Sequence, residues 1–549
     1  MSAQSANGNG VEKINEQPES QIDLLSYHEQ HAGRHVVDPQ QAKVEFGEIL
    51  ASKLKLTSDG TKVLWPQPTD DPEDPQNWTN RRKTVQLIVI TLASTVPDFD
   101  GGIGIVGVFA LAKQYHTTTG VINDLTASWS IFLLGATIEM FYPQRSTLTI
   151  AGFGGIFAVM LMRKFGRLPV LFWSQGLYVV TDIYPFHSQA RMLSVWTMGF
   201  LISPSLSPLA FGFLIARTTW RWAYGIGCLY GLAIVLLIAG FLEETMYDRT
   251  VKPIPLRPST GMRYRIESLV GITGIYMAKY RPSWYEIILS PFNVLWRPHL
   301  LGALIFEGVL FGFSIGVFVT LAVFFGSPPP VGLGLTPFAI SGLYGTVTVS
   351  ILIGELICRY LNDWIMGVTI RRNKGVHEAE SRLWACYLAV ALYVCGFVVL
   401  GISIQYKLTI GAVIMGWGIA SVAVMINTVA VYAYCTDCFP KRQGEISALT
   451  HLARTLGGFS VAYFQVPWAT KDGAVQTFGV EAAIVSGSGD KTIRVWDVVS
   501  GTEVLSAMRG HGDSSAAFSV NGFQIESGSD DYSLRVWNAA SGTEALPAL

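Results

Sequence analysis

The sequence predicts an all-α, polytopic membrane protein with a short β fragment at its C-terminus. Half of its 549 residues are hydrophobic, 14% are charged and the mean hydropathy is +0.37, a profile typical of chains that cross a bilayer repeatedly. Apolar runs recur between residues 84 and 466. We expect about nine of these runs to span the hydrocarbon core of a bilayer as helices.

Composition also excludes several functions. The formal net charge of −1 argues against a nucleic-acid partner. The six cysteines are scattered, so no disulfide framework is expected. Cys435 and Cys438 form a C-x-x-C, but no second pair accompanies them, and we interpret them as part of a helix end without a metal. The nine histidines are dispersed, which argues against a membrane enzyme, and no cofactor is expected.

The N-terminal region, residues 1–78, is polar and has little apolar periodicity, which predicts a disordered cytosolic tail. The first apolar run begins only at Thr84, so no signal peptide is expected. A glycosylation sequon begins at Asn77, but a cytosolic position would leave it unused.

The first apolar run predicts a helix over Thr84–Ala112 and places two acids, Asp98 and Asp100, within it. A carboxylate at membrane depth is costly and normally faces a cavity or a partner, so both acids are candidates for a transport site. The alternative is that residues 97–100 form an outer loop after a shorter helix over Thr84–Val96, which alone would be too short to cross.

The stretch from Thr181 to Arg249 contains two long apolar runs, Met192–Ala216 and Trp222–Leu242, joined by a short turn. They predict an antiparallel pair of membrane helices. Small residues and prolines lie at close spacing in the first run: Gly199, Ser203, Pro204, Ser207 and Pro208. Such residues let another backbone approach closely, so we expect this helix to pack tightly against neighbours.

Three motifs resemble one family. GFLISPSLSP, residues 199–208, resembles the fifth-helix signature of major facilitator antiporters. EETMYDR, residues 243–249, is similar to the end of the sixth helix in fungal drug:proton antiporters, and DPEDPQNWTNRRK, residues 71–83, resembles their cytosolic approach to the first helix. The resemblance implies two helical bundles and a transporter that moves a small solute, by proton-coupled antiport, across the plasma membrane.

The chain departs from the family pattern after its second predicted helix, Ser146–Met162. The basic loop that follows contains Arg163, Lys164, Gly166 and Arg167 and is similar to the family's loop G-x-x-x-D-R-x-G-R-R, with Arg163 in place of the aspartate and Val159 in place of the glycine. In the family this loop closes the cytosolic side through charge pairs, and the two replacements weaken that expectation. Only residues 170–180 remain for the third and fourth helices, and eleven residues cannot cross a bilayer.

We therefore expect an incomplete major facilitator fold. Residues 79–248 would form an N-terminal bundle that lacks two helices, 249–298 a basic cytosolic linker, and 299–485 a C-terminal bundle with a truncated last helix. The predicted spans of the second bundle are Leu300–Phe325, Pro337–Tyr360, Leu383–Ile404, Leu408–Tyr434 and Ile446–Val466. Basic residues follow the second and fourth of these spans, which places the N-terminus in the cytosol by the positive-inside rule.

Polar residues in the second bundle supply further candidates. Glu307 lies in its first helix, the pseudo-symmetric counterpart of the helix with the two acids, and Asn427 follows a flexible G-W-G. We expect Glu355 to be an interfacial charge and Arg454 to snorkel to the cytosol. A carboxylate in a cavity can bind a proton that substrate later displaces, and its alternative role is that of a fixed anion for cationic substrates.

The last region, residues 486–549, changes character. SGSGDKTIRVWDVVSGTEV begins at residue 486, and a similar segment begins at residue 527. This period resembles WD40 repeats, and the residues that carry the resemblance are Asp490, Trp496, Asp497, His511, Asp531 and Trp537. Two partial blades cannot close a propeller, so we expect an exposed fragment whose partner is unknown.

Transport of a small molecule within a lipid bilayer is thus the predicted function. Two alternatives stay open: an inactive truncated or fused product of a transporter, and a membrane-anchored WD40 interaction protein.

Overall fold

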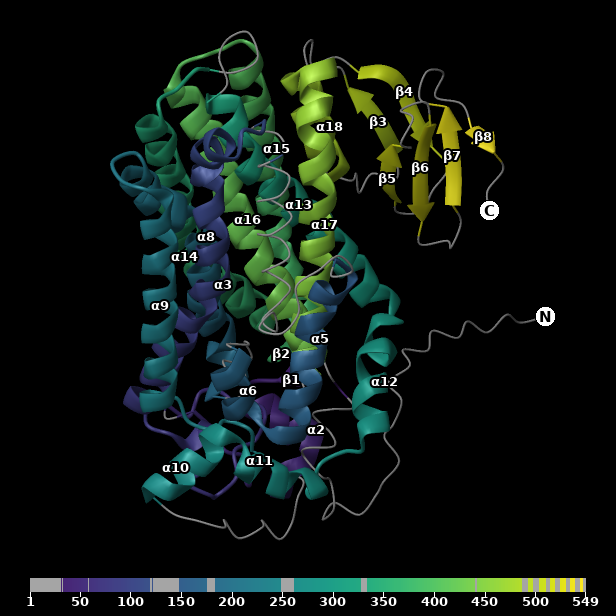
Figure 1. The fold of residues 1–549 in the computed structure, drawn as a ribbon. Coiled ribbons are helices and arrows are strands. Elements are labelled where there is room, and N and C mark those ends of the chain that lie inside the picture. Colours follow the sequence, from purple (N-terminus) through teal and green to yellow (C-terminus); the bar gives the residue numbers. More distant parts are fainter. Residues whose placement is uncertain are drawn as a thin grey trace, which may run out of the picture.

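The computed structural model describes residues 31, 33–57, 59–118, 121, 148–174, 183–247, 261–326, 333–439 and 442–485, together with strand residues between 492 and 546. Its long helices run side by side in an elongated bundle, with shorter helices gathered at one end (Figure 1). Within the described residues, six helices are long and apolar enough to cross a membrane. The predicted helical, multi-pass architecture is confirmed.

The first half of the bundle precedes residue 248. Its helices are α3 (Asn80–Tyr115), α5 (Leu148–Phe165), α6 (Arg167–Ser174), α8 (Phe186–Ile215) and α9 (Trp220–Phe241). The Thr79 side chain caps α3 by accepting a hydrogen bond from the Arg82 backbone. Because α3 continues through Pro97, the alternative of an outer loop at residues 97–100 is wrong. Close to Pro97, the Ser203 hydroxyl of α8 donates a hydrogen bond to the Thr95 carbonyl of α3.

Close contact between α3 and α8 depends on small residues. A Cβ atom added at Gly199 of α8 would lie 2.5 Å from Cγ2 of Thr91 in α3. A Cβ atom added at Gly102 of α3 would lie 2.8 Å from a carbonyl oxygen of α8. The other residues of α8 at this contact are Ser203, Pro204, Ser207 and Pro208. The two backbones therefore approach to a distance that larger side chains would prevent.

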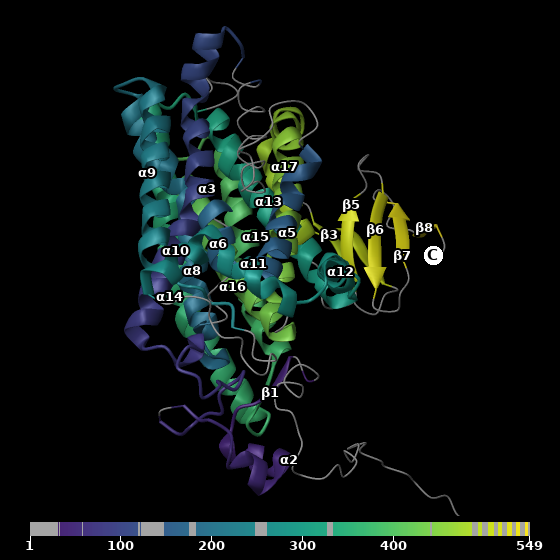
Figure 2. The ribbon, with the colours of Figure 1, turned by 60° about the horizontal axis from the view of Figure 1, so that its bottom comes forward.

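The described part of the linker between the halves, from residue 261 on, is mostly helical. It comprises α10 (Gly261–Val270), α11 (Ile272–Met277), the 3₁₀ turn η2 (Ala278–Tyr280) and α12 (Trp284–Leu295). Helix α12 lies at the edge of the bundle beside α5 in both views (Figures 1 and 2). Its N-terminus is capped by the Ser283 hydroxyl, which accepts a hydrogen bond from the Glu286 backbone.

The second half of the bundle follows directly. Its helices are α13 (Pro298–Gly326), α14 (Pro337–Arg372), α15 (Trp384–Gln405), α16 (Ile410–Cys438), α17 (Gln443–Asp472) and α18 (Ala474–Val485). The five predicted spans correspond to α13–α17, but α14 continues about three turns beyond its predicted end. Helix α18 has 12 residues, fewer than a membrane crossing needs. Between α14 and α15 lie strand β2 (Val376–Glu378) and the 3₁₀ turn η3 (Ala379–Leu383).

The segment 33–78, called here the N-terminal segment, differs from the expected disordered tail. Its elements are β1 (Arg34–Val36), α2 (Pro39–Ala51) and the 3₁₀ turn η1 (Pro75–Asn77). Strand β1 pairs antiparallel with β2, and Trp65, which is 1% exposed, anchors a small apolar core. The prediction of disorder is corrected for this segment, because its few apolar residues find partners on α8 and α14 rather than within the segment alone.

The C-terminal region contains short strands. They are β3 (Thr492–Trp496), β4 (Glu503–Arg509), β5 (Ser514–Phe518), β6 (Gln524–Ser529), β7 (Leu534–Asn538) and β8 (Glu544–Leu546). Strands β5–β8 form an antiparallel sheet in sequence order, and β3 pairs with β4. Trp496 is the last residue of β3, and Trp537 lies within β7. The other four residues that carry the resemblance lie outside the described residues: Asp490, Asp497, His511 and Asp531. The assignment of these strands to WD40 blades stays a prediction.

Candidate functional site

A buried ion pair connects two helices of the second half. Glu307 of α13 is fully buried, and Arg454 of α17 is 3% exposed. The guanidinium donates to Glu307 Oε1 from Nε at 2.9 Å and from one terminal nitrogen at 2.6 Å. Thr428 of α16 donates to the same oxygen at 3.0 Å, and Asn427 donates to Oε2 at 3.3 Å. Both oxygens of Glu307 thus have donors, an arrangement that stabilises the ionised carboxylate.

Arg454 is enclosed by aromatic rings. Its guanidinium carbon lies 4.4 Å from the ring centre of Phe311, 5.1 Å from Phe200 and 5.2 Å from Tyr432. The expectation that Arg454 snorkels to the cytosol is therefore wrong. The sequence did contain a signal against it: the basic residue Arg442 lies 12 residues earlier, and 12 helical residues span about 18 Å, which exceeds the reach of a side chain.

Glycines bring α13 and α17 close enough for this pair to form. Gly308 and Gly312 of α13 face Gly457 of α17. A Cβ atom added at Gly312 would lie 2.7 Å from the carbonyl carbon of Gly457, and one added at Gly457 would overlap the Gly308 carbonyl oxygen. Because Gly308 follows Glu307 and Gly457 follows Arg454 by one turn, the close crossing fixes the positions of both charges.

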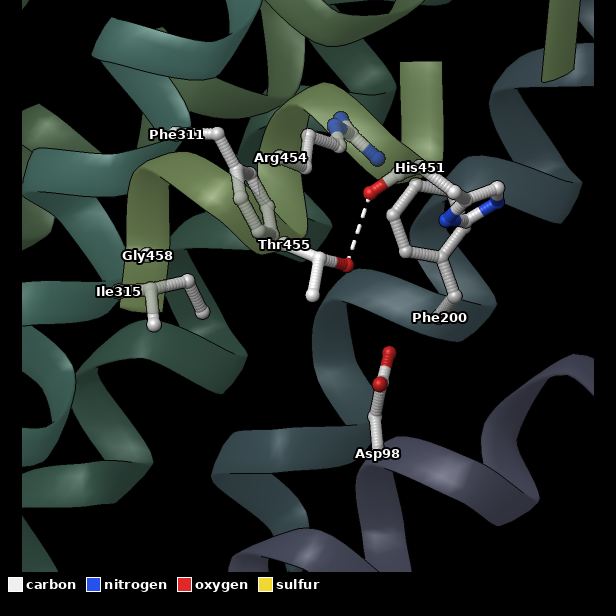
Figure 3. A pocket seen from close by; sticks show the side chains of 8 residues that line it. All are labelled: Asp98, Phe200, Phe311, Ile315, His451, Arg454, Thr455 and Gly458. Atoms are coloured by element: carbon white, nitrogen blue, oxygen red, sulfur yellow. Dashed lines mark hydrogen bonds between the residues drawn. The ribbon is translucent and has the colours of Figure 1, made fainter. Parts of the chain in front are cut away.

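A cavity lies beside the ion pair, where the two halves meet. Asp98 of α3 and Phe200 of α8 line it from the first half. The residues that line it from the second half are Phe311, Ile315, His451, Arg454, Thr455 and Gly458. The Asp98 carboxyl points into this space, below Thr455 and Phe200 (Figure 3). Residues far apart in the sequence thus form one wall of aromatic rings with an acid, an imidazole and a guanidinium.

Asp98 differs from Glu307 in its partners. The Asp98 side chain is buried, with 8% exposed, yet its Oδ1 has no hydrogen-bond partner among the described residues. Nε2 of His451, on the same cavity, also has none among them. A buried acid without a full set of donors is one for which the neutral and the ionised forms compete. Asp100 lies in α3 as expected, but the position of its side chain lies outside the described residues.

The predicted basic loop joins the two halves at one end of the bundle. Arg163, in the last turn of α5, forms an ion pair with Glu445 at the start of α17. Ser290 of α12 donates to Glu445 Oε1 at 2.6 Å and accepts from Arg163 at 2.9 Å. Lys164 donates to the Pro282 carbonyl at 3.0 Å. The arginine that replaces the family's aspartate therefore still makes a charge pair across the halves.

The rest of this loop is held by one carboxylate. Gly166 has a φ of +97°, which favours glycine, and lies next to Glu244. Glu244 accepts hydrogen bonds from the backbone N–H groups of Arg167 and Leu168 at 3.0 and 3.1 Å. These contacts tie the start of α6 to the end of α9.

Two other predicted features lie away from the cavity. Glu355 forms an ion pair at 2.7 Å with Arg359, one turn later on α14. With 7% of the residue exposed, Glu355 is more buried than we expected for an interfacial charge. Cys435 and Cys438 are free cysteines, and no group of three possible metal ligands occurs in the described part of the chain.

Comparisons with known proteins agree with this architecture. The family model described as Major Facilitator Superfamily matches residues 125–462. A model described as WD domain, G-beta repeat, matches residues 471–497, of which 474–485 form α18 and not a strand.

Two fungal proteins are similar to most of this chain. Efflux pump radE of Floropilus chiversii is 23% identical over 484 residues, which cover 83% of this chain and 86% of that protein. Protein HOL1 of Saccharomyces cerevisiae is 22% identical, covering 82% of this chain and 93% of its own. Among solved structures, the human organic anion transporter MFSD10 (TETRAN) is 14% identical, with a TM-score of 0.44, and the match covers 73% of this chain and 97% of that one.

Proposed function

Because this chain belongs to the Major Facilitator Superfamily and is an integral, multi-pass membrane protein, we propose that it exchanges a small solute for a proton at the cavity between its halves. The observation that supports this function best is Asp98, a buried acid that faces the cavity with one oxygen lacking a hydrogen-bond partner among the described residues. An acid that is not committed to a cation can change its protonation state when substrate enters.

The other predicted candidates take different roles in this proposal. Glu307 accepts hydrogen bonds from Arg454, Thr428 and Asn427, so in this proposal it serves as the counter-ion of the guanidinium and is not the exchanging acid. The aromatic rings of Phe200 and Phe311 supply the apolar surface for a solute.

We also propose an orientation and a set of domains. The plasma membrane holds the chain, with the N-terminal segment in the cytosol together with the basic loop 163–167 and the linker 249–298. The first bundle covers residues 79–248, the second 299–485 and the WD40-like fragment 486–549. Two contacts support this orientation, those of Arg163 with Glu445 and of Gly33 with Asp437. Each brings together segments that lie next to basic clusters, and basic clusters are expected on the cytosolic side.

The proposal is tested with Asp98→Asn, which removes the acid and keeps its shape. In purified protein, we expect one pH-titrating component to disappear from the infrared carbonyl band of protonated carboxylic acids. In proteoliposomes, we expect pH-driven accumulation of ethidium to be lost. Ethidium is an aromatic cation, and its charge and rings match the acid and the aromatic side chains that line the cavity. The matched control is Glu286→Gln, which neutralises an exposed acid of α12 and should leave ethidium accumulation unchanged. An unchanged band and unchanged accumulation in Asp98→Asn would refute the exchange role.

A second candidate function is that Asp98 is a fixed anion for cationic solutes. It is favoured by the neutralisation of Arg454 by Glu307, which leaves Asp98 as the acid facing the cavity. In that case Asp98→Asn loses ethidium binding at every pH, and binding to the wild type releases no proton. A wild type that accumulates no dye under any gradient would instead favour an inactive, truncated or fused product.

A further inference from the structure

Helix α12, in the linker between the halves, has two faces of different character. The face that packs on the bundle consists of Ile287, Ser290, Pro291 and Val294, all buried. The opposite face consists of Tyr285, Ile288, Phe292 and Trp296, whose exposed fractions are 75, 47, 59 and 89%. These positions repeat every three or four residues, so they form one continuous apolar stripe along the helix.

The helix that carries this stripe is followed directly in the chain by a helix that spans the membrane. Trp296 is followed at residue 298 by α13, whose apolar window Leu300–Phe318 is long enough to cross. Leu301 and Ile305, one turn apart on α13, are exposed by 44 and 59%. The exposed apolar face of a spanning helix lies in lipid. Because α12 precedes the start of such a helix by only two residues, we expect its exposed apolar stripe to lie near the same lipid, close to the headgroups.

Charges at the two ends of α12 suit phospholipid headgroups. Lys279 precedes the helix and Arg297 follows it, and both side chains are exposed. Aromatic side chains beside basic residues are typical of the boundary between hydrocarbon and headgroups, where anionic lipids attract cations. On the opposite face, Ser290 is fixed by its hydrogen bonds with Arg163 and Glu445, so the helix cannot turn its apolar stripe inwards.

We propose that α12 is a membrane-contact helix, whose stripe of Tyr285, Ile288, Phe292 and Trp296 docks into the leaflet at the Arg163 end of the bundle and prefers anionic phospholipid. This assignment rests on the membrane insertion of the family and holds whether or not Asp98 exchanges a proton. One face of α12 therefore touches lipid, while the other contacts the Arg163–Glu445 ion pair that joins the two halves.

The test is photo-crosslinking of the full-length protein in liposomes of phosphatidylcholine and phosphatidylglycerol. The photoreactive amino acid p-benzoylphenylalanine replaces Phe292, a conservative change for an exposed aromatic residue. The matched control places it at Val44 of α2, which is 79% exposed but lies in the N-terminal segment. We expect a lipid adduct, identified by its mass, at position 292 and none at position 44. Equal adduct yields at the two positions, no lipid adduct at 292, or an adduct with protein instead of lipid would overturn the proposal.

The preference for anionic lipid is tested in the same assay. Lys279→Gln combined with Arg297→Gln should lower the share of phosphatidylglycerol among the adducts at position 292 towards its share in the liposome. Lys43→Gln, which removes an exposed cation of α2, should leave that share unchanged. If phosphatidylglycerol makes up the same share of the adducts as of the liposome when Lys279 and Arg297 are both intact, the preference for anionic lipid is refuted.

Discussion

At the scale of single residues, the buried charges beside the cavity are of two kinds, those paired with an opposite charge and those that face the cavity without such a partner. The Glu307–Arg454 pair is an example of the first kind, since both partners are almost fully buried. A buried pair gains little over an apolar pair of the same volume, but removal of one partner leaves an uncompensated charge. The pair therefore affects the stability of the protein most when one of its two partners is removed.

We predict that Glu307→Gln destabilises the protein by about 3–5 kcal/mol, because it leaves the Arg454 guanidinium buried without an anion. The double variant Glu307→Gln with Arg454→Met should recover much of that loss, since neither charge then remains. Thermal unfolding followed by tryptophan fluorescence in detergent measures both. Glu267→Gln, which breaks the exposed pair with Arg263, is the control and should change stability by less than about 1 kcal/mol. A single variant as stable as the wild type would contradict this account.

Sequence reasoning at this scale identified polar residues in apolar helices but not their pairing. Asp98, Glu307 and Asn427 stand out because acids and amides are rare at membrane depth. That Asn427 donates to Glu307 depends on how α16 packs against α13, which no local pattern encodes. The position of Arg454 near the start of a helix suggests that its side chain reaches the cytosol, but its distance from the basic residue Arg442 argues against this.

At the scale of helices, glycine spacing decides which elements touch. Gly308, Gly312 and Gly316 recur every four residues on α13, and a Cβ atom added at any of them would lie 3.0 Å or less from an atom of α17. Gly302, on the same helix, has no atom within 4 Å of such a Cβ. One helix thus provides both a tight contact and an open position for comparison.

We predict that Gly457→Ala pushes α17 away from α13, because its methyl group would overlap the Gly308 carbonyl oxygen. Overpacking of this kind typically costs about 1–3 kcal/mol. The Glu307–Arg454 contact should lengthen as well, so dye accumulation should fall along with thermal stability. Gly302→Ala is the matched control and should leave both at wild-type values. If Gly457→Ala behaves like Gly302→Ala, the close crossing is not what holds the pair.

The positions of the long helices were predictable, whereas their ends were not. Apolar runs indicated α8, α9 and α13–α17 because spanning helices have a characteristic length and composition. The last turns of α14 are more polar, with two arginines at the end, and so fell outside the predicted span. The small residues of α8 were recognised as packing positions, but their neighbour, α3, follows only from the fold.

At the scale of the whole molecule, the N-terminal segment joins the two halves. Strand β1 pairs with β2 of the second half, and the Gly33 N–H donates to the Asp437 carbonyl at 3.0 Å. Trp65 contributes the other connection, because its carbonyl accepts a hydrogen bond from the Phe186 N–H at the start of α8 in the first half. Sequence alone suggested disorder here, since the segment is polar overall and its small apolar core is completed by Phe186 of the first half and by Met366 and Val376 of the second.

Trp65 is the residue on which this connection most depends, because it is 1% exposed and its indole N–H donates to the Val36 carbonyl at 2.8 Å. We predict that Trp65→Ala empties the small core of the N-terminal segment and releases it from both halves, since truncating a buried tryptophan typically costs about 3–5 kcal/mol. Limited proteolysis should then cut between residues 39 and 64 many times faster than in the wild type, while the bundle itself stays folded on size-exclusion chromatography. Val44→Ala, which removes an exposed side chain of α2, should leave the cleavage rate unchanged. If Trp65→Ala is cut no faster than Val44→Ala, strand pairing with β2 suffices to hold the segment, and the apolar core does not bind the two halves together.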